Sequence, residues 1–280
     1  IDHVDDKDIV RALNISDGQE VWRHSYADAS KHNYGYARST PLYDEGRLYT
    51  ISRLGNVHCL DATDGSVIWS MNMKSKFSGA SPKWDYAASP YIDGDTLIVC
   101  PGGTSAPVVA LDKTTGETQW TGGASGMPGY ATPVKAQLQG IDQYVIFTAK
   151  KLTGIRSSDG QVMWTFPWET KYGVNAATPI VGGNYIFITS DYGKGCSLVE
   201  ITADGAEAVW TNTALKSHFN PPVFYNGYVF GIGNPGFMVS LDSRTGETMW
   251  QEKGLERGGL CAVDDVLIAL DGKDGDCVMM

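Results

Sequence analysis

The chain has 280 residues, of which 42% are apolar and 19% charged, and its formal net charge is −10. This composition can form a buried core and argues against disorder, while the negative charge disfavours nucleic-acid binding, which needs a basic surface. The 33 glycines exceed the usual share of about 7% and favour many turns between short strands. No apolar run reaches the roughly 18 residues that a membrane-spanning helix needs.

The beginning of the chain, Ile1 to Asp8, is acidic and lacks an apolar stretch. It is therefore not a signal peptide, and the Ile start suggests that upstream residues are missing. The five cysteines are far apart and odd in number, so we expect buried free thiols rather than a complete disulfide framework or a metal site. They are Cys59, Cys100, Cys196, Cys261 and Cys277.

A repeat that ends in tryptophan runs through the chain at intervals of 40 to 51 residues. Such fixed-period similarity is typical of solenoids and propellers. In five copies a Gly stands four residues before the Trp, as in CLDATDGSVIW from Cys59, whereas the copy ending at Trp210 has one extra residue after Gly205. The six repeat tryptophans are Trp22, Trp69, Trp120, Trp164, Trp210 and Trp250.

Each repeat predicts two β-hairpins. The Gly of the phrase can adopt the left-handed conformation that closes a tight hairpin, and the Trp lies on the strand that follows. Upstream stands a strand, turn and strand pattern such as PLYDEGRLYTI from Pro41. Four antiparallel strands in about 45 residues form a propeller blade. Since no sustained helical periodicity occurs, we expect an all-β protein with almost no helix.

Counting blades in chain order gives an incomplete blade at each end. Residues 8–26 supply the last two strands of one blade, and the tail from Gly258 supplies two strands and enters a third. We therefore expect residues 1–280 to be a single domain of about six blades, a segment of a seven- or eight-bladed propeller, because unpaired sheet edges aggregate. The alternative is a closed six-bladed ring. Five full blades are predicted at 38–73, 86–121, 129–168, 175–213 and 219–252.

The repeated phrase resembles the tryptophan-docking repeat of the PQQ-type β-propellers, over nearly the whole chain. This superfamily includes quinoprotein alcohol dehydrogenases and the propeller lipoprotein of the outer-membrane BAM complex, and the most similar group is the PQQ-binding-like β-propeller repeat proteins. The resemblance implies that the six tryptophans are structural and pack against the Gly turn of an adjacent blade. It also implies a bacterial periplasmic or cell-envelope location.

The chemistry of the quinoprotein enzymes is not matched in this chain. That family carries a vicinal Cys-Cys disulfide and a Ca²⁺ ion with Glu and Asn ligands, and this sequence has no adjacent cysteines. We therefore expect a non-catalytic scaffold that binds a protein or a small ligand, with no cofactor and no metal. The alternative is a PQQ- and Ca²⁺-dependent dehydrogenase of alcohols or sugars. A hydrolase or lyase acting on a sugar or polymer has no specific support.

Two further motifs resemble ligand-binding sequences, but the residues around or within them do not fit those sites. GIGNPG, from Gly231 to Gly236, fits a dinucleotide fingerprint, but a strand rather than a helix follows, so a turn is expected. DGKDGD, from Asp271 to Asp276, places Lys273 and Gly275 where a calcium loop needs oxygen ligands, so a hairpin is expected.

A candidate ligand site lies just before the first strand of the blades, where residues of successive blades would meet at one mouth of the funnel. An anionic or polyhydroxyl ligand would suit these cationic, aromatic and amide groups. The alternative is that they hold the loops between blades by hydrogen bonds. The candidates are Arg38, Tyr86, Tyr130, Asn175, His218 and Arg257.

Two long loops, 27–37 and 74–86, collect cationic and aromatic residues. An exposed Trp84 would suit a sugar face or a protein partner, and the alternative is an ordinary solvated loop. The loop residues concerned are Lys31, His32, Tyr34, Lys74, Lys76, Lys83 and Trp84.

Overall fold

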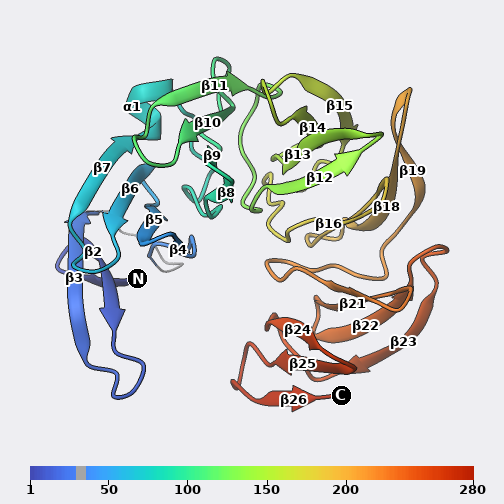
Figure 1. Ribbon diagram of the computed structural model, residues 1–280. Helices are drawn as coiled ribbons and strands as arrows, with labels where there is room; N and C mark the ends of the chain where they lie inside the picture. The colour runs from blue at the N-terminus through green and yellow to red at the C-terminus, as the bar shows by residue number, and fades with distance from the viewer. Residues whose placement is uncertain (30–35) are drawn as a thin grey trace. The chain divides into compact units, whose positions relative to one another are not determined.

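The protein is built almost entirely from antiparallel β-sheets, as the computed structural model shows (Figure 1). The structure describes residues 1–29 and 36–280. These residues form five four-stranded sheets, two three-stranded sheets and one five-residue helix. In every sheet the strands follow one another in chain order, which is the topology of a propeller blade. The all-β fold class, the four-stranded blades and the scarcity of helix are therefore confirmed.

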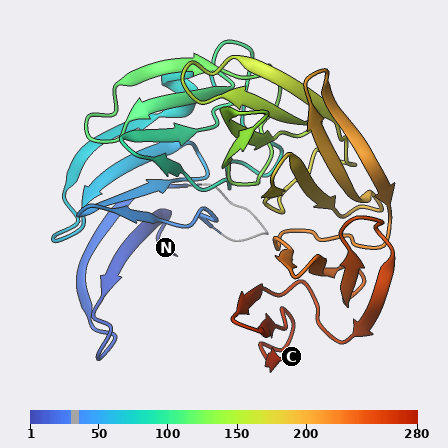
Figure 2. The same ribbon diagram turned by 45° about the vertical axis from the view of Figure 1, so that its right-hand side comes forward.

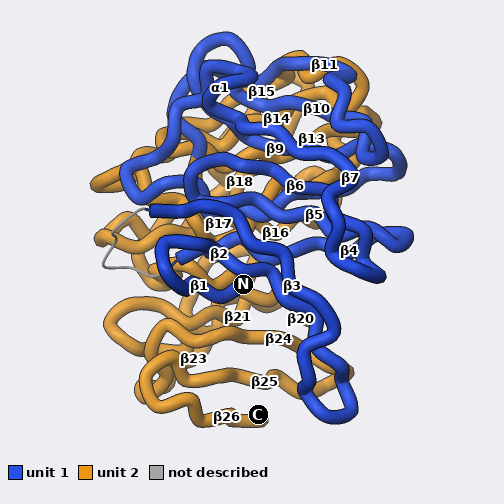
Figure 3. The backbone as a smooth tube through the Cα atoms, turned by 90° about the vertical axis from the view of Figure 1, so that its left-hand side faces the viewer, with its two compact units in different colours: residues 1–128 blue, residues 129–280 orange. Residues whose placement is uncertain are grey.

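The first of two compact units, residues 1–128, contains three sheets (Figure 3). The predicted blades at 38–73 and 86–121 match its two four-stranded sheets to within one residue at the C-terminal end. The strands are β1 (Asp2–Val4), β2 (Lys7–Leu13) and β3 (Glu20–Ala27); β4 (Leu42–Asp44), β5 (Arg47–Ile51), β6 (Asn56–Asp61) and β7 (Val67–Asn72); and β8 (Tyr91–Asp93), β9 (Thr96–Val99), β10 (Val108–Asp112) and β11 (Thr118–Gly122).

The second unit, residues 129–280, contains three four-stranded sheets and a final three-stranded sheet. The prediction of one domain over 1–280 stays a prediction. The strands are β12 (Val134–Leu138), β13 (Ile141–Phe147), β14 (Lys151–Arg156) and β15 (Val162–Pro167); β16 (Ile180–Gly182), β17 (Tyr185–Ser190), β18 (Gly195–Thr202) and β19 (Gly205–Asn212); β20 (Val223–Tyr225), β21 (Tyr228–Gly233), β22 (Phe237–Asp242) and β23 (Thr248–Lys253); and β24 (Leu260–Val263), β25 (Val266–Leu270) and β26 (Cys277–Met279).

Neighbouring sheets within each unit lie face to face (Figure 2). Apolar side chains pack between them. In the first unit Tyr49 and Val57 join one cluster with Leu97 and Val109 of the next sheet. In the second unit Phe187 and Cys196 join Val229 and Leu241 in the same way. The buried alternate residues of the strands therefore build the core between sheets, and we call each such contact region a seam.

The repeated phrase forms the turn before the fourth strand. The Gly65 N–H donates to the Asp61 carbonyl at 2.9 Å, and the Asp61 carboxylate accepts the Thr63 N–H at 2.8 Å. Gly65 has φ +75, the left-handed conformation that Gly adopts without steric cost. A register shift directly follows Cys59, the residue that faces Trp69, and such a bulge re-aims the neighbouring side chain.

Three tryptophans dock on the turn of the following sheet in the same unit. The indole N–H groups of Trp22, Trp69 and Trp210 donate to the carbonyls of Ala62, Lys113 and Ser243 at 2.9, 3.0 and 3.1 Å. Each indole also covers the Gly of that turn, as Trp210 covers Gly246. This geometry agrees with the structural role that the resemblance implies.

Trp164 and Trp250 depart from this pattern, so the expectation that all six tryptophans pack against the Gly turn of the adjacent blade was wrong for these two: no atom lies within 4 Å of a Cβ at Gly205 or Gly275. Trp164 is buried and covers Gly154, which faces it in its own sheet, while its N–H donates to the Gln143 Oε1 at 2.8 Å. Any side chain at position 154 would overlap the space that the Trp164 indole occupies. Trp250 is 41% exposed. Trp22, Trp69, Trp120 and Trp210 are half-buried.

Three local predictions need correction or completion. The first sheet has a third strand, β1, because the turn at Asp5 and Asp6 lets residues 2–4 pair with β2. The loop 74–86 begins inside a one-turn helix, α1 (Met73–Phe77), whose first N–H groups are capped by the Asn72 side chain. Trp84 is half-buried rather than exposed. Of the other predicted loop, Lys31, His32 and Tyr34 lie outside the described residues.

The two rejected motifs are turns, as expected. Gly231 to Gly236 ends β21 and leads into β22, and Asp271 to Asp276 joins β25 to β26. The Asp271 carboxylate accepts the backbone N–H groups of Glu256, Lys273 and Asp274. A carboxylate engaged in this way stabilises the turn.

Candidate functional site

Two of the six predicted site residues belong to the first unit. Tyr86 is buried in the core, and its hydroxyl donates to the Pro101 carbonyl at 2.8 Å. Arg38 is exposed, and its guanidinium donates to the Trp84 carbonyl. Tyr86 therefore holds a loop by a buried hydrogen bond, the role that the alternative interpretation expected.

Tyr130 and Asn175 of the second unit are joined through the backbone, where the Tyr130 N–H donates to the Asn175 carbonyl at 2.8 Å. The Asn175 side chain is fully buried. Its amide donates to the carbonyls of Thr148, Ala149 and Trp168, and its Oδ1 accepts from the Ser190 hydroxyl at 2.8 Å. Asn175 therefore fastens three chain segments together and has no surface for a ligand.

His218 and Arg257 lie close enough for their charges to interact. Burial lowers the pKa of His218, Asp191 opposes this effect, and Arg257 adds to it. His218 is 10% exposed, and its Nδ1 lies 3.6 Å from an oxygen of Asp191. The Asp191 carboxylate accepts a hydrogen bond from the Asn234 amide at 3.2 Å. His218 is therefore predominantly neutral at neutral pH, with an exposed arginine, Arg257, nearby. Whether the six predicted residues share one mouth stays a prediction.

Four rings form a continuous surface around His218. Tyr172 meets Tyr192 edge-on at 5.4 Å between ring centroids, Tyr192 meets His218 edge-on at 5.1 Å, and His218 stacks on Phe219 at 3.8 Å. Tyr172, Tyr192 and Phe219 are 47%, 38% and 54% exposed. We call these four residues the aromatic platform.

The platform stands on three loops of the second unit. Tyr172 lies between β15 and β16, Tyr192 between β17 and β18, and His218 and Phe219 between β19 and β20. Both tyrosines have positive φ, +100 and +59, a conformation that disfavours bulky residues and concentrates at functional sites. The hydrogen bonds of Asn175 lie at the base of the same loop as Tyr172.

Two lysines lie on the loops that carry the platform tyrosines. The ammonium of Lys171 lies 5.3 Å from the centroid of the Tyr172 ring, and that of Lys194 lies 4.5 Å from the Trp168 ring. Tyr192 and Tyr172 were missed in the sequence, although a signal existed. Each belongs to a charged residue–Tyr–Gly triplet, Lys171-Tyr172-Gly173 and Asp191-Tyr192-Gly193, at a turn.

A second polar cluster lies in the first unit, in the seam between β3 and β6. Tyr26 stacks on His58 at 4.7 Å, and His24 lies 5.2 Å from His58. Asp8 is fully buried and accepts from His3 at 2.9 Å. Burial lowers the pKa of His58 to about 4, with a further contribution from the charge of His24. Among residues 1–29 and 36–280, no group of three His, Cys, Asp or Glu side chains is arranged to hold a metal ion.

The platform therefore offers a large exposed aromatic contact area. Large aromatic rings and Arg are enriched in the energetically important centres of protein interfaces. The blades and this surface together define a β-propeller with an exposed aromatic platform on its loops.

The family follows from the sequence. Residues 6–252 match the family described as "Outer membrane protein assembly factor BamB", and the chain belongs to this family. It is 24% identical over 268 residues to such an assembly factor from Yersinia pestis, covering 92% of this chain and 62% of that protein. It is 21% identical over 269 residues to one from Moranella endobia, covering 88% and 63%. The chain thus spans less than two thirds of the length of these relatives.

Solved structures share the fold. BamB from Moraxella catarrhalis superposes with a TM-score of 0.64 at 20% identity, covering 97% of this chain and 79% of that one. A europium-containing methanol dehydrogenase gives 0.67 at 12% identity, covering 97% and 74%. The dehydrogenase carries the same architecture only, whereas the relatives matched by sequence are assembly factors. No helix among the described residues is long and apolar enough to span a membrane.

Proposed function

We propose that the protein is a non-catalytic scaffold of the bacterial cell envelope that binds a protein partner during outer membrane protein assembly. The observation that carries this proposal is the aromatic platform, with its three exposed rings and the lysines on its loops. The membership of this chain in a family of outer membrane protein assembly factors favours a protein over a metabolite as the partner.

The chemistry of the platform indicates what the partner presents. Exposed rings of Tyr172, Tyr192 and Phe219 can bury apolar side chains, and Lys171, Lys194 and Arg257 favour an acidic neighbour. We therefore expect a partner segment that combines apolar and acidic residues. The small anionic or sugar ligand expected from the sequence has less support, because Tyr86 and Asn175 use their polar atoms to bind backbone carbonyls.

Complementation tests this proposal. In cells lacking the gene, the wild-type protein should restore the level of folded outer membrane proteins, whereas the double variant Tyr172→Ser, Phe219→Ser should not. Tyr43→Ser is the matched control, because Tyr43 is 65% exposed in the first unit, outside the platform. Equal rescue by the platform variant, produced at the same level as the wild type, would contradict the proposal.

A further inference from the structure

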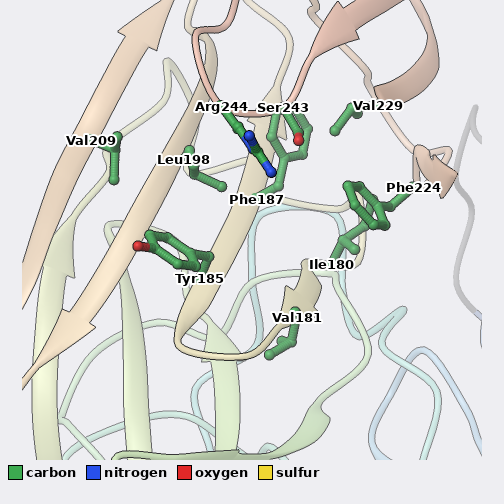
Figure 4. A pocket seen from close by; sticks show the side chains of 11 residues that line it. Ile180, Val181, Tyr185, Phe187, Leu198, Val209, Phe224, Val229, Ser243 and Arg244 are labelled. Atoms are coloured by element: carbon green, nitrogen blue, oxygen red, sulfur yellow. The ribbon is translucent and has the colours of Figure 1, made fainter. Parts of the chain in front are cut away.

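One seam of the second unit is open and forms a pocket of about 360 Å³ (Figure 4). It lies between the β16–β19 sheet and the β20–β23 sheet. Phe187 and Val229 are buried at the pocket, whereas Tyr185, Val209 and Phe224 are 43%, 47% and 52% exposed beside them. The volume falls within the range of small-molecule sites, roughly 300–1,000 Å³.

The equivalent seam of the first unit is closed by charges. Lys113, whose side chain is 5% exposed, lies 2.7 Å from a carboxylate oxygen of Asp44 and 3.0 Å from one of Glu45. The Tyr49 hydroxyl donates to the Lys113 carbonyl at 3.1 Å. An ammonium group with two carboxylates therefore fills this seam.

The open seam carries smaller or apolar residues at the same places. Trp69 docks on the Lys113 carbonyl and Trp210 on that of Ser243, so Ser243 is the equivalent of Lys113. The strand pairings Asp44–Arg47 and Gly182–Tyr185 make Gly182 the equivalent of Asp44. Phe187, which pairs with Ile180, stands where Tyr49 pairs with Leu42. The pocket thus exists because the ion-pair residues and the hydroxyl are replaced.

Arg244 gives the apolar pocket a cationic element. Its side chain points toward Phe187 in Figure 4. The nearby Asp242 carboxylate accepts the backbone N–H groups of Arg244 and Thr245 at 2.8 and 3.0 Å, which lower its pKa. The negative charge of Asp242 weakens the field of the guanidinium, so the preference for anions should be moderate.

We infer that the open seam binds a small amphiphile with an apolar body and an anionic head group. The apolar body lies against Phe187, Leu198 and Phe224, and the head group lies near the Arg244 guanidinium. This site involves different loops and different chemistry from the aromatic platform, so it does not depend on the proposed function.

Calorimetry with two single-chain amphiphiles of opposite charge tests the inference. Decanoate should bind the wild-type protein at one site, and decyltrimethylammonium at least about fivefold more weakly. Arg244→Gln should weaken decanoate binding about five- to tenfold, the range for a partly exposed charged hydrogen bond. The same variant should not weaken the binding of decyltrimethylammonium. Lys253→Gln, which removes an exposed positive charge at the far end of β23, is the control and should change neither affinity.

A second variant fills the pocket by introducing the ion-pair residues that the equivalent seam of the first unit contains. Gly182→Asp with Ser243→Lys should abolish binding of both amphiphiles, and a Cβ at Gly182 meets no atom within 4 Å. Circular dichroism and thermal melting establish that each variant is folded. Equal affinity of the wild type for the two amphiphiles, or decanoate binding unchanged in Arg244→Gln, would overturn the inference. Decanoate binding retained by the folded closed variant would place the ligand elsewhere and overturn it as well.

Discussion

Replacing Gly246 with Ala tests how much tryptophan docking stabilises the second unit. Gly246 has φ +74, and a Cβ there would lie 2.6 Å from the Cε3 atom of Trp210 and 2.8 Å from the Asn212 amide nitrogen. The left-handed conformation costs a non-glycine residue about 1–2 kcal/mol, and the overpacking adds roughly 1–3 kcal/mol. The free energy of unfolding should therefore fall by about 2–5 kcal/mol in urea titrations.

Gly275→Ala is the matched control for this prediction. Gly275 has nearly the same φ, +77, in the equivalent turn of the last sheet, but nothing lies within 4 Å of its Cβ position. Only the backbone strain, about 1–2 kcal/mol, applies there. Equal destabilisation by the two variants would refute the reasoning, since the contact with Trp210 would then contribute nothing.

Three further predictions follow from burial. Trp164→Phe should lower the free energy of unfolding in urea by about 2–3 kcal/mol, because it leaves the buried Gln143 oxygen without its donor. Trp250→Phe should lower it by less than about 0.5 kcal/mol. Similar losses for the two variants would contradict this prediction. His58 has a folded pKa of about 4, below its unfolded value of 6.5. Unfolding therefore takes up protons, and stability should fall as the pH drops from 6.5 toward 4, by up to about 3 kcal/mol; a His58→Phe variant with the same pH slope would exclude His58 as the cause. Burial raises the pKa of Cys100 and Cys196 to about 12. In the native protein a thiol reagent should therefore modify the exposed Cys261 and Cys277 rapidly, whereas Cys100 and Cys196 should react only in urea. Rapid labelling of Cys196 in the native protein would contradict the packing.

The blades were predictable because each is encoded locally. Turn glycines such as Gly65 and the alternation of the adjoining strands specify a hairpin within a few residues. Trp164 packs in its own sheet rather than on the turn of the next sheet because of the residue that pairs with it across the strands. Gly154 stands where the other copies have a residue with a side chain, such as Cys59 or Ser240, and this difference was visible in the sequence without its consequence being drawn.

The candidate site was less predictable because position along the chain does not decide side-chain direction. Tyr86 and Asn175 stand before a first strand, as expected. Their side chains donate buried hydrogen bonds to nearby backbone carbonyls, and these hydrogen bonds hold the side chains inside the protein rather than in solvent. His218 and Arg257 lie near each other, and the rings beside His218 come from turns that the repeat did not mark. The contact of Tyr192 with Tyr172 depends on the packing of two sheets.

Crosslinking in living cells tests the central claim, that the aromatic platform binds a protein of the outer membrane assembly machinery. A photoreactive phenylalanine is placed at Tyr172 or Phe219, and at Tyr43 as the control, and the adducts are identified by mass spectrometry. The account predicts adducts with an envelope protein of that machinery from the two platform positions and their absence at Tyr43. The same adducts at Tyr43, or none from either platform position in protein that is folded and exported, would contradict it.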